Sequence, residues 1–240
     1  MLLGLNVGNT NVAFGVFEGM TFAASGSVPH ADLPFLAERI GARQIRRILA
    51  GSVAPSLNDR IAAQMASAFG LPVEFAGVDI PFGIDIEYEP PTALGADRAL
   101  NAIAAFARVK GAAVVIDAGT ATTVDLVTQR GAFAGGAITP GPALMARALH
   151  AGTELLPDVA VREAPPLPPR NTADAIRGGV YWGTVGMAEE IVRRLREVAG
   201  AKTPLLVTGG AGEMLAREMK ERPPYYPHLT LEGLAVIAGR

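Results

Sequence analysis

Two short stretches of the chain contain residues that could bind the phosphates of a nucleotide. The first reads Leu-Asn-Val-Gly-Asn-Thr-Asn-Val at 5–12, and the second reads Ile-Asp-Ala-Gly-Thr-Ala-Thr-Thr at 116–123. Each joins two apolar runs, so each is expected to form a tight turn between strands. Glycine lets the backbone approach an anion closely, and turn N–H groups with Thr or Asn side chains donate hydrogen bonds to phosphate oxygens. The sequence therefore predicts two phosphate-binding turns related by an internal repeat.

The two turns differ at one position that matters for catalysis. Asp117 in the second turn corresponds to Asn6 in the first. A carboxylate does not bind phosphate directly, so its expected role is to hold a cation or a cation-bound water. Asparagine keeps a neutral oxygen at position 6 but lacks the negative charge.

A third candidate segment lies between the two turns. Gly-Ala-Asp-Arg at 95–98 precedes a helical pattern at 99–109, which places backbone N–H groups, an acid and a guanidinium at a helix N-terminus. That end of a helix attracts anions, and arginine binds carboxylates and phosphates through two parallel hydrogen bonds. Taken alone, Asp97 and Arg98 would also fit a helix cap with a salt bridge. The two phosphate turns and the glycine-rich segments at 135–141 and 208–211 favour a binding site.

The elements that must position these residues follow the same order in both halves of the chain. In the first half we expect strands at 2–5, 12–17, 20–25, 45–50 and 73–75, and helices at 33–40 and 57–69, the second capped by Ser56. In the second half we expect strands at 112–116, 122–127, 132–133 and 204–208, and helices at 142–151, 171–199, 213–219 and 231–238. This order predicts an α/β fold with helices on both faces of each sheet. The expected domains are 1–108 and 109–240.

The composition is that of a well-buried globular protein. The chain has 240 residues, of which 50% are hydrophobic and 18% charged, enough for two domains. A net charge of −2 gives no reason to expect nucleic acid as a partner, and we interpret the basic cluster at 43–47 as a solvated helix end. The absence of cysteine excludes disulfides and thiolate chemistry. Without a signal peptide or an apolar run of membrane-spanning length, we expect a cytoplasmic protein with no membrane partner.

Motifs distributed over the chain resemble those of type III pantothenate kinase. They are Gly-Asn-Thr-Asn at 8–11, Gly-Ala-Asp-Arg at 95–98, Asp-x-Gly-Thr-Ala-x-Thr at 117–123, Gly-Gly-x-Ile-x-Pro-Gly at 135–141, Asn-Thr-x-x-Ala-Ile at 171–176 and Thr-Gly-Gly at 208–210. The resemblance implies duplicated actin-like, ribonuclease H-like α/β domains with a nucleotide cleft between them, as in the acetate kinase, sugar kinase, Hsp70 and actin superfamily. It also implies ATP-dependent phosphorylation of pantothenate, the first step of coenzyme A synthesis.

The resemblance further implies a role for each matching residue. Asp97 would be the catalytic base, and Asp117 would ligate K⁺ or NH₄⁺, while Mg²⁺ would accompany ATP. The residues implied in ATP binding are Asn6, Val7, Gly8, Asn9, Thr10, Asn11, Val12, Ala13 and Thr120. The residues implied in pantothenate binding are Tyr88, Gly95, Ala96, Asp97, Arg98 and Thr172.

The resemblance also implies a homodimer, because in the family the threonine matching Thr172 comes from the neighbouring subunit. The helical stretch 171–199 carries Gly178, Gly179, Gly183 and Gly186 at the three- to four-residue spacing of one helix face. Glycine weakens a helix, so this run indicates that another backbone packs closely there. Packing against a helix of the same chain is the alternative.

Asn6 keeps two other functions open. The family has aspartate at this position, where it is expected to hold Mg²⁺, so the chain could be a weakly active or non-catalytic member that acts as an accessory or regulatory factor. It could also be a superfamily kinase or phosphatase acting on another small alcohol, such as a sugar. The retained Asp97, Asp117 and Thr120 favour an active enzyme, and Gly-Ala-Asp-Arg in a chain of this length favours pantothenate.

Overall fold

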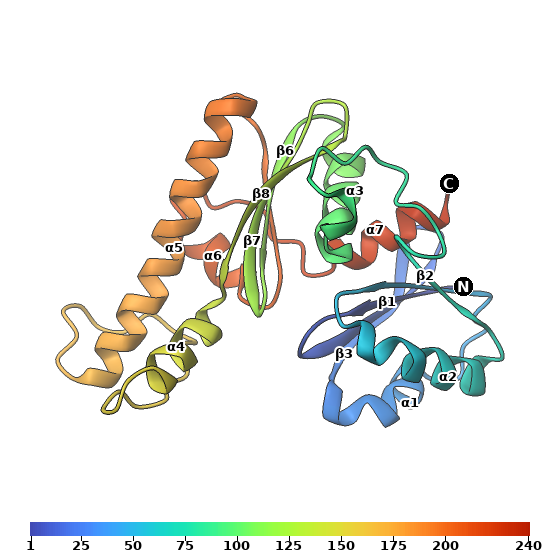
Figure 1. Cartoon of the computed structure of the whole chain (residues 1–240), viewed down its shortest axis with the longest axis horizontal. Helices are drawn as coiled ribbons and strands as arrows, with labels where there is room; N and C mark the ends of the chain where they lie inside the picture. Colours follow the sequence, from blue (N-terminus) through green and yellow to red (C-terminus); the bar gives the residue numbers. More distant parts are fainter. The chain divides into compact units, whose positions relative to one another are not determined.

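The computed structural model describes residues 1–240 and divides into two compact units (Figure 1). Unit 1 contains residues 1–111, 129–133 and 228–240, and unit 2 contains residues 112–128 and 134–227. This division differs from the expected 1–108 and 109–240 in three places. The first segment of unit 1 continues to Gly111, and the loop at 129–133 and the C-terminal helix also belong to unit 1.

Unit 1 is built on a five-stranded sheet of order β3-β2-β1-β4-β5. Its strands are β1 (Leu2–Val7), β2 (Asn11–Glu18), β3 (Thr21–Pro29), β4 (Arg47–Ser52) and β5 (Val73–Phe75). The strands β1, β2 and β3 are antiparallel neighbours, while β4 runs parallel to both β1 and β5. Side chains alternate along a strand, so Leu3, Leu5 and Val7 lie on one face of β1 and Asn6 lies on the other.

Helices cover both faces of this sheet, as expected. The helices α1 (Leu36–Ile40) and α2 (Asn58–Phe69) pack on the face that carries Leu3, Leu5 and Val7. The helices α3 (Ala96–Val109) and α7 (Leu229–Ala238) pack on the opposite face, where Leu100 and Leu234 join one apolar cluster. Short 3₁₀ turns occupy His30–Phe35, Pro55–Leu57 and Pro91–Ala93.

Close packing between α3 and α7 explains why the last helix belongs to unit 1. A Cβ atom at Gly233 would overlap the backbone of Leu100, so only glycine permits this approach. The buried Thr230 hydroxyl donates a hydrogen bond to Asn101 Oδ1 at 2.8 Å, and Arg108 pairs with Glu232 at 2.7 Å. Figure 1 shows the two helices side by side.

Unit 2 repeats the strand order of unit 1 with one strand fewer. Its sheet has the order β8-β7-β6-β9, which corresponds to β3-β2-β1-β4. The strands are β6 (Ala113–Ala118), β7 (Ala121–Val127), β8 (Phe133–Pro140) and β9 (Leu205–Thr208). A single parallel bridge between Val207 and Tyr225 occupies the place of a fifth strand. The duplication predicted from the sequence is therefore present.

The helices of unit 2 are α4 (Pro142–Ala151), α5 (Thr172–Ala199) and α6 (Gly212–Glu218). Apolar residues of α5 and α6 pack on the sheet face that carries Val114, Ile116 and Val124. Asn171 caps α5, because its Oδ1 accepts a hydrogen bond from the Asp174 backbone N–H at 2.8 Å. The 28-residue α5 is the longest helix, and neither it nor any other helix has the apolar stretch that a membrane crossing needs.

Several of the expected elements differ in detail, and three of them illustrate how. Ser56 does not cap α2, because Pro55 begins a 3₁₀ turn that contains it and the helix starts at Asn58. The helix expected at 33–40 divides into a 3₁₀ turn and α1, since Pro34 interrupts it. The strand expected at 132–133 continues to Pro140 and so includes Gly135 and Gly136.

Candidate active site

The first phosphate turn is a tight hairpin between β1 and β2. The Gly8 backbone N–H donates to the Asn11 carbonyl at 3.0 Å. His30, the first residue of the 3₁₀ turn after β3, supports the hairpin, because its Nε2 donates to the Gly8 carbonyl at 2.9 Å. Asn9, Thr10 and Asn11 are exposed, which leaves their side chains accessible to a ligand. No local pattern predicts this role of His30, because the contact joins residues distant along the chain.

Asn6 lies on the sheet face that α3 covers. It pairs with Gly51 of β4, and paired residues on neighbouring strands present their side chains to the same face. A Cβ atom at Gly51 would overlap the Leu100 side chain and lie 3.8 Å from Ala96, both on α3. The absence of a side chain at Gly51 therefore lets the first turn of α3 approach the end of β1.

Asp97 lies in the first turn of α3, close to the same end of β1. A Cβ atom at Gly95 would be 2.7 Å from Asp97 Oδ1 and 3.6 Å from Val53. The Val53 backbone N–H in turn donates to the Val7 carbonyl at 2.9 Å. Asp97 and Asn6 thus occupy the same face and the same edge of the first sheet, next to the hairpin at 8–11.

Burial raises the pKa of the Asp97 carboxyl above its ordinary value. The backbone N–H of Arg98, which donates to Asp97 Oδ1 at 2.8 Å, and the Arg98 charge lower this pKa only in part. Gly95 occupies the N-cap position of α3, and no side chain caps the helix. A carboxylate with a raised pKa is a stronger base than an ordinary one, so it is better suited to accept a proton from a bound hydroxyl.

Arg98 is held beside two aromatic rings. Its side chain is only 4% exposed, and its Cζ atom lies 5.4 Å from the centre of the Tyr88 ring and 5.1 Å from that of Phe133. The structure therefore brings together Tyr88, Asp97 and Arg98, as the sequence predicted for a substrate site. It adds Phe133, which carried no sequence signal for such a role.

The second phosphate turn lies where three glycine-containing segments of unit 2 meet. The Gly141 N–H donates to the Thr120 carbonyl at 2.9 Å, and the Ala211 N–H donates to the Ala118 carbonyl at 2.8 Å. Gly209 has a φ of +88°, and a Cβ atom there would be 2.5 Å from Asp117 Oδ1. The two glycine-rich segments, at 135–141 and 208–210, thus meet at the β6–β7 turn. They lie beside Asp117 and the exposed Thr120.

The surroundings of Asp117 fit a monovalent cation. Thr123 and Thr208 pair with Asp117 from the two neighbouring strands and share its sheet face. The Thr123 hydroxyl is buried and has no hydrogen-bond partner in the chain. A hard cation takes oxygen ligands, so a carboxylate beside an unpartnered hydroxyl is a chemically suitable donor set.

Tyr225 holds the glycine-rich segment after β9 in place. Its hydroxyl donates to the Gly209 carbonyl at 3.1 Å. Burial raises the pKa of the Tyr225 hydroxyl, and the nearby carboxylates of Glu213 and Asp117 raise it further. Sequence analysis missed this residue, because nothing local predicts that Tyr225 pairs beside β9.

Thr172 begins α5 and lines an apolar cavity of about 800 Å³ between α4 and α5. Gly179 lines the same cavity. An added Cβ atom at Gly179, Gly183 or Gly186 would have no neighbour within 4 Å, whereas one at Gly178 would meet Pro165 and Pro169. No other part of this chain therefore packs closely on three of the four glycines, and the alternative of packing within the chain applies only to Gly178.

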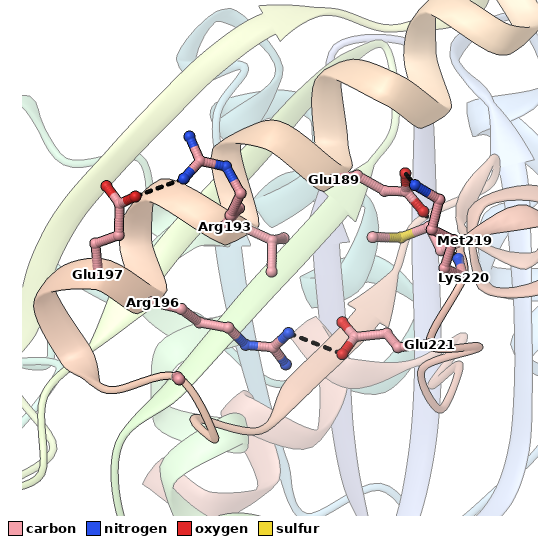
Figure 2. Close-up of a pocket in the computed structure, with 9 residues that line it drawn as sticks. Glu189, Arg193, Arg196, Glu197, Met219, Lys220 and Glu221 are labelled. Atoms are coloured by element: carbon pink, nitrogen blue, oxygen red, sulfur yellow. Dashed lines mark hydrogen bonds and ion pairs between the residues drawn. The ribbon is translucent and has the colours of Figure 1, made fainter.

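A second cavity in unit 2, of about 420 Å³, contains none of the expected site residues (Figure 2). It lies between the C-terminal half of α5 and the segment after α6. Its charged side chains neutralise one another, with Arg196 and Glu221 paired at 2.8 Å and Lys220 and Glu189 at 3.8 Å. This cavity therefore offers no uncompensated charge for an ionic substrate.

Solved structures share the fold of this chain. A putative Baf family transcriptional activator from Campylobacter jejuni covers 99% of this chain and 97% of its own, with a TM-score of 0.62 and 22% identity. A putative 2-dehydro-3-deoxygalactonokinase from Sinorhizobium meliloti covers 100% and 97%, with a TM-score of 0.58 and 12% identity. Together with the duplicated sheets, these likenesses define an actin-like α/β fold.

Sequence comparison identifies the family within this class. The sequence model of type III pantothenate kinase matches residues 2–194. The type III pantothenate kinase of Geobacter sulfurreducens is 32% identical over 252 residues, covering 100% of this chain and 99% of that protein. That of Dehalococcoides mccartyi strain 195 is 35% identical over 248 residues, covering 98% and 96%. The chain belongs to the type III pantothenate kinase family, as its motifs indicated, and is therefore a kinase.

Proposed function

We propose that this chain transfers the γ-phosphoryl group of ATP to the primary hydroxyl of pantothenate, the first step of coenzyme A synthesis, in the cytoplasm. The observation that carries the proposal is the buried Asp97 carboxyl. It lies beside Arg98 at the start of α3, at the same edge of the sheet as the first phosphate turn. The family membership of the chain supports the same reaction.

Phosphoryl transfer requires positioning and charge stabilisation more than covalent chemistry from the protein. The pantothenate hydroxyl oxygen attacks the γ-phosphorus, the bond to the bridging oxygen breaks, and ADP leaves. Asp97 orients the hydroxyl and accepts its proton. Arg98 binds the carboxylate of pantothenate, with Tyr88, Gly95 and Ala96 completing the substrate contacts.

The two turns supply the nucleotide contacts in this proposal. Residues 6–13 bind the phosphates of ATP through backbone N–H groups and the exposed Asn and Thr side chains, and Thr120 contacts ATP from the second turn. Asp117 and the Thr123 hydroxyl would hold K⁺ or NH₄⁺, and Mg²⁺ would be bound mainly by ATP and water. When bound, the cations would supply positive charge that offsets the charge on the phosphates.

The first prediction concerns the cations. ADP formation should depend on both pantothenate and Mg²⁺, and K⁺ or NH₄⁺ should stimulate it more than Na⁺. Asp117→Asn removes the proposed charged ligand and should abolish the preference for K⁺. A coupled assay of ADP release in the three salts measures this effect.

Asp59→Asn, an exposed change on α2, is the matched control and should keep the wild-type response. If Asp117→Asn retains the full K⁺ stimulation, the cation lies elsewhere.

The proposed dimer uses α5, and its partner is a second copy of this chain. Gly179, Gly183 and Gly186 leave a smooth strip on which a second helix can pack closely. The apolar cavity with Thr172 on its rim adjoins this strip through Gly179. In this dimer Thr172 of one subunit contacts pantothenate bound to the other.

The second prediction is complementation between two defective subunits. Asp97→Asn lacks the base and Thr172→Val lacks the substrate contact, so each variant alone should turn over poorly at low pantothenate concentration. Co-expressed subunits should regain activity, because a mixed dimer contains one site with Asp97 intact and Thr172 supplied by its partner. ADP release by the purified mixed dimer measures the recovery.

A mixture of Asp97→Asn with Asp97→Ala is the control, since neither subunit can supply the base, and it should stay inactive. A different affinity tag on each subunit isolates the mixed dimers, and sedimentation confirms that the isolated species is a dimer. A mixed Asp97→Asn and Thr172→Val dimer without recovered activity would show that Thr172 does not act across subunits.

A further inference from the structure

The ring of Phe133 forms a compact group with Tyr88 and Arg98 inside unit 1. Its centre lies 5.1 Å from Arg98 Cζ and 5.9 Å from the centre of the Tyr88 ring, which it meets edge-on at 78°. Phe133 is fully buried and Arg98 is 4% exposed. The guanidinium is therefore removed from bulk water and lies against two aromatic rings.

Backbone contacts fix Phe133 in this position. Its N–H donates to the Asp85 carbonyl at 2.9 Å, and its carbonyl accepts from the Glu87 N–H at 2.8 Å. The same loop approaches α3 at Gly131, where a Cβ atom would be 2.9 Å from the Phe106 ring. Phe133 thus joins the segment that ends in Tyr88 to the helix that carries Arg98.

Two physical effects make the rings important for Arg98. A cation is attracted to an aromatic face, and the attraction grows when water is excluded. A long arginine side chain also loses considerable rotamer freedom when it is fixed. Rings that hold the guanidinium before substrate arrives reduce the entropy lost on binding. An aliphatic side chain at position 133 would fill space but provide no such attraction.

We propose that Phe133 is a positioning residue for substrate recognition. Together with Tyr88 it holds the Arg98 guanidinium ready for two parallel hydrogen bonds to the carboxylate of the substrate. Phe133 acts through Arg98 and does not take part in phosphoryl transfer. The inference rests on the proposed role of Arg98 in binding pantothenate.

The test compares pantothenate with an analogue in which a neutral amide replaces the carboxylate. Phe133→Leu should raise KM for pantothenate about 10-fold, with kcat and KM for ATP within about 2-fold of wild type. For the amide analogue, kcat/KM should not change, because Arg98 has no carboxylate to bind. Phe133→Tyr keeps an aromatic face and should restore KM for pantothenate. Phe133→Met, which also lacks a ring, is made in parallel in case the leucine variant does not fold.

Two controls separate positioning from packing. Phe17→Leu removes an equally buried ring of unit 1 from the cluster around Leu49, and it should lower stability without changing KM for pantothenate. In an Arg98→Gln background, Phe133→Leu should add no further rise in KM, because the two changes act on one interaction.

The outcomes distinguish this inference from the function on which it rests. An active wild type whose Phe133→Leu variant keeps its KM for pantothenate would overturn the inference alone. Equal losses with pantothenate and with the amide analogue would overturn it too, since they would show a packing role. A wild type with no turnover, or an Arg98→Gln variant with unchanged KM for pantothenate, would overturn the proposed role of Arg98 and this inference together.

Discussion

Replacing Asp97 with asparagine is expected to lower kcat about 100-fold or more, while the affinities for ATP and pantothenate stay close to wild type. Asparagine has nearly the shape of aspartate and can still accept the hydrogen bond from the Arg98 N–H. It cannot accept the proton of the substrate hydroxyl. Steady-state kinetics for kcat, and calorimetric binding of each substrate, separate these two effects.

The same variant should be more stable than wild type at neutral pH. Burial raises the pKa of the Asp97 carboxyl, so the folded state favours the protonated form. The contribution of Asp97 to the free energy of unfolding is therefore fully present below the pKa that its carboxyl has in the unfolded chain. It is lost as the pH rises through the higher pKa that the carboxyl has in the folded protein. Asp97→Asn removes this loss, and thermal melts of both proteins at pH 7 should show a higher Tm for the variant.

Asp59→Asn on α2 is the control and should change neither kcat nor Tm. An unchanged kcat in Asp97→Asn would mean that Asp97 only supports the start of α3. A loss of kcat accompanied by an equal loss of pantothenate affinity would assign Asp97 to binding rather than to proton transfer.

Replacing Asn6 with aspartate is expected to raise kcat about 10- to 100-fold, equivalent to roughly 1.4 to 2.7 kcal/mol of transition-state stabilisation. It should also lower the Mg²⁺ concentration needed for half-maximal rate. The internal repeat motivates this expectation, because Asp117 occupies the corresponding place in unit 2. A carboxylate attracts a hard dication more strongly than an amide oxygen does. Mg²⁺ titrations of the two proteins at saturating ATP measure the change.

The geometry adds a second signature of this variant. Asn6 and Asp97 lie on the same face and edge of the first sheet, so a new carboxylate at position 6 disfavours ionisation of Asp97. In Asn6→Asp the acid limb of the kcat–pH profile should therefore move to higher pH. Asn6→Ser, which adds no charge, is the control. Overlapping Mg²⁺ curves, or slower turnover by Asn6→Asp, would show that the missing carboxylate is not what limits the rate.

Local sequence signals predicted most of the elements. The two glycine-containing turns and the bounds of α4 and β5 depend on residues adjacent in the chain. The repeat of the turns also predicted the repeated strand order. Gly-Ala-Asp-Arg placed Asp97 and Arg98 at a helix start, although α3 begins at Ala96 rather than Ala99.

What the sequence did not predict depends on contacts between distant segments. The helix α7 packs on α3 through Gly233, so it joins unit 1 although it ends the chain. His30 and Phe133 support the first turn and Arg98 through hydrogen bonds and ring contacts across the fold. No periodicity or local motif predicts such contacts between distant residues. Each of these residues, considered alone, has a type that is common at ordinary buried or surface positions.

One assay shows whether the wild-type chain phosphorylates pantothenate. The purified protein is incubated with pantothenate, Mg²⁺-ATP and K⁺, ADP release is followed, and the product is identified by ³¹P NMR and mass spectrometry. We expect ADP release that requires pantothenate and matches, mole for mole, a phosphate ester on its primary hydroxyl. Absence of this product, with ADP release no faster than in a pantothenate-free reaction, would contradict the account.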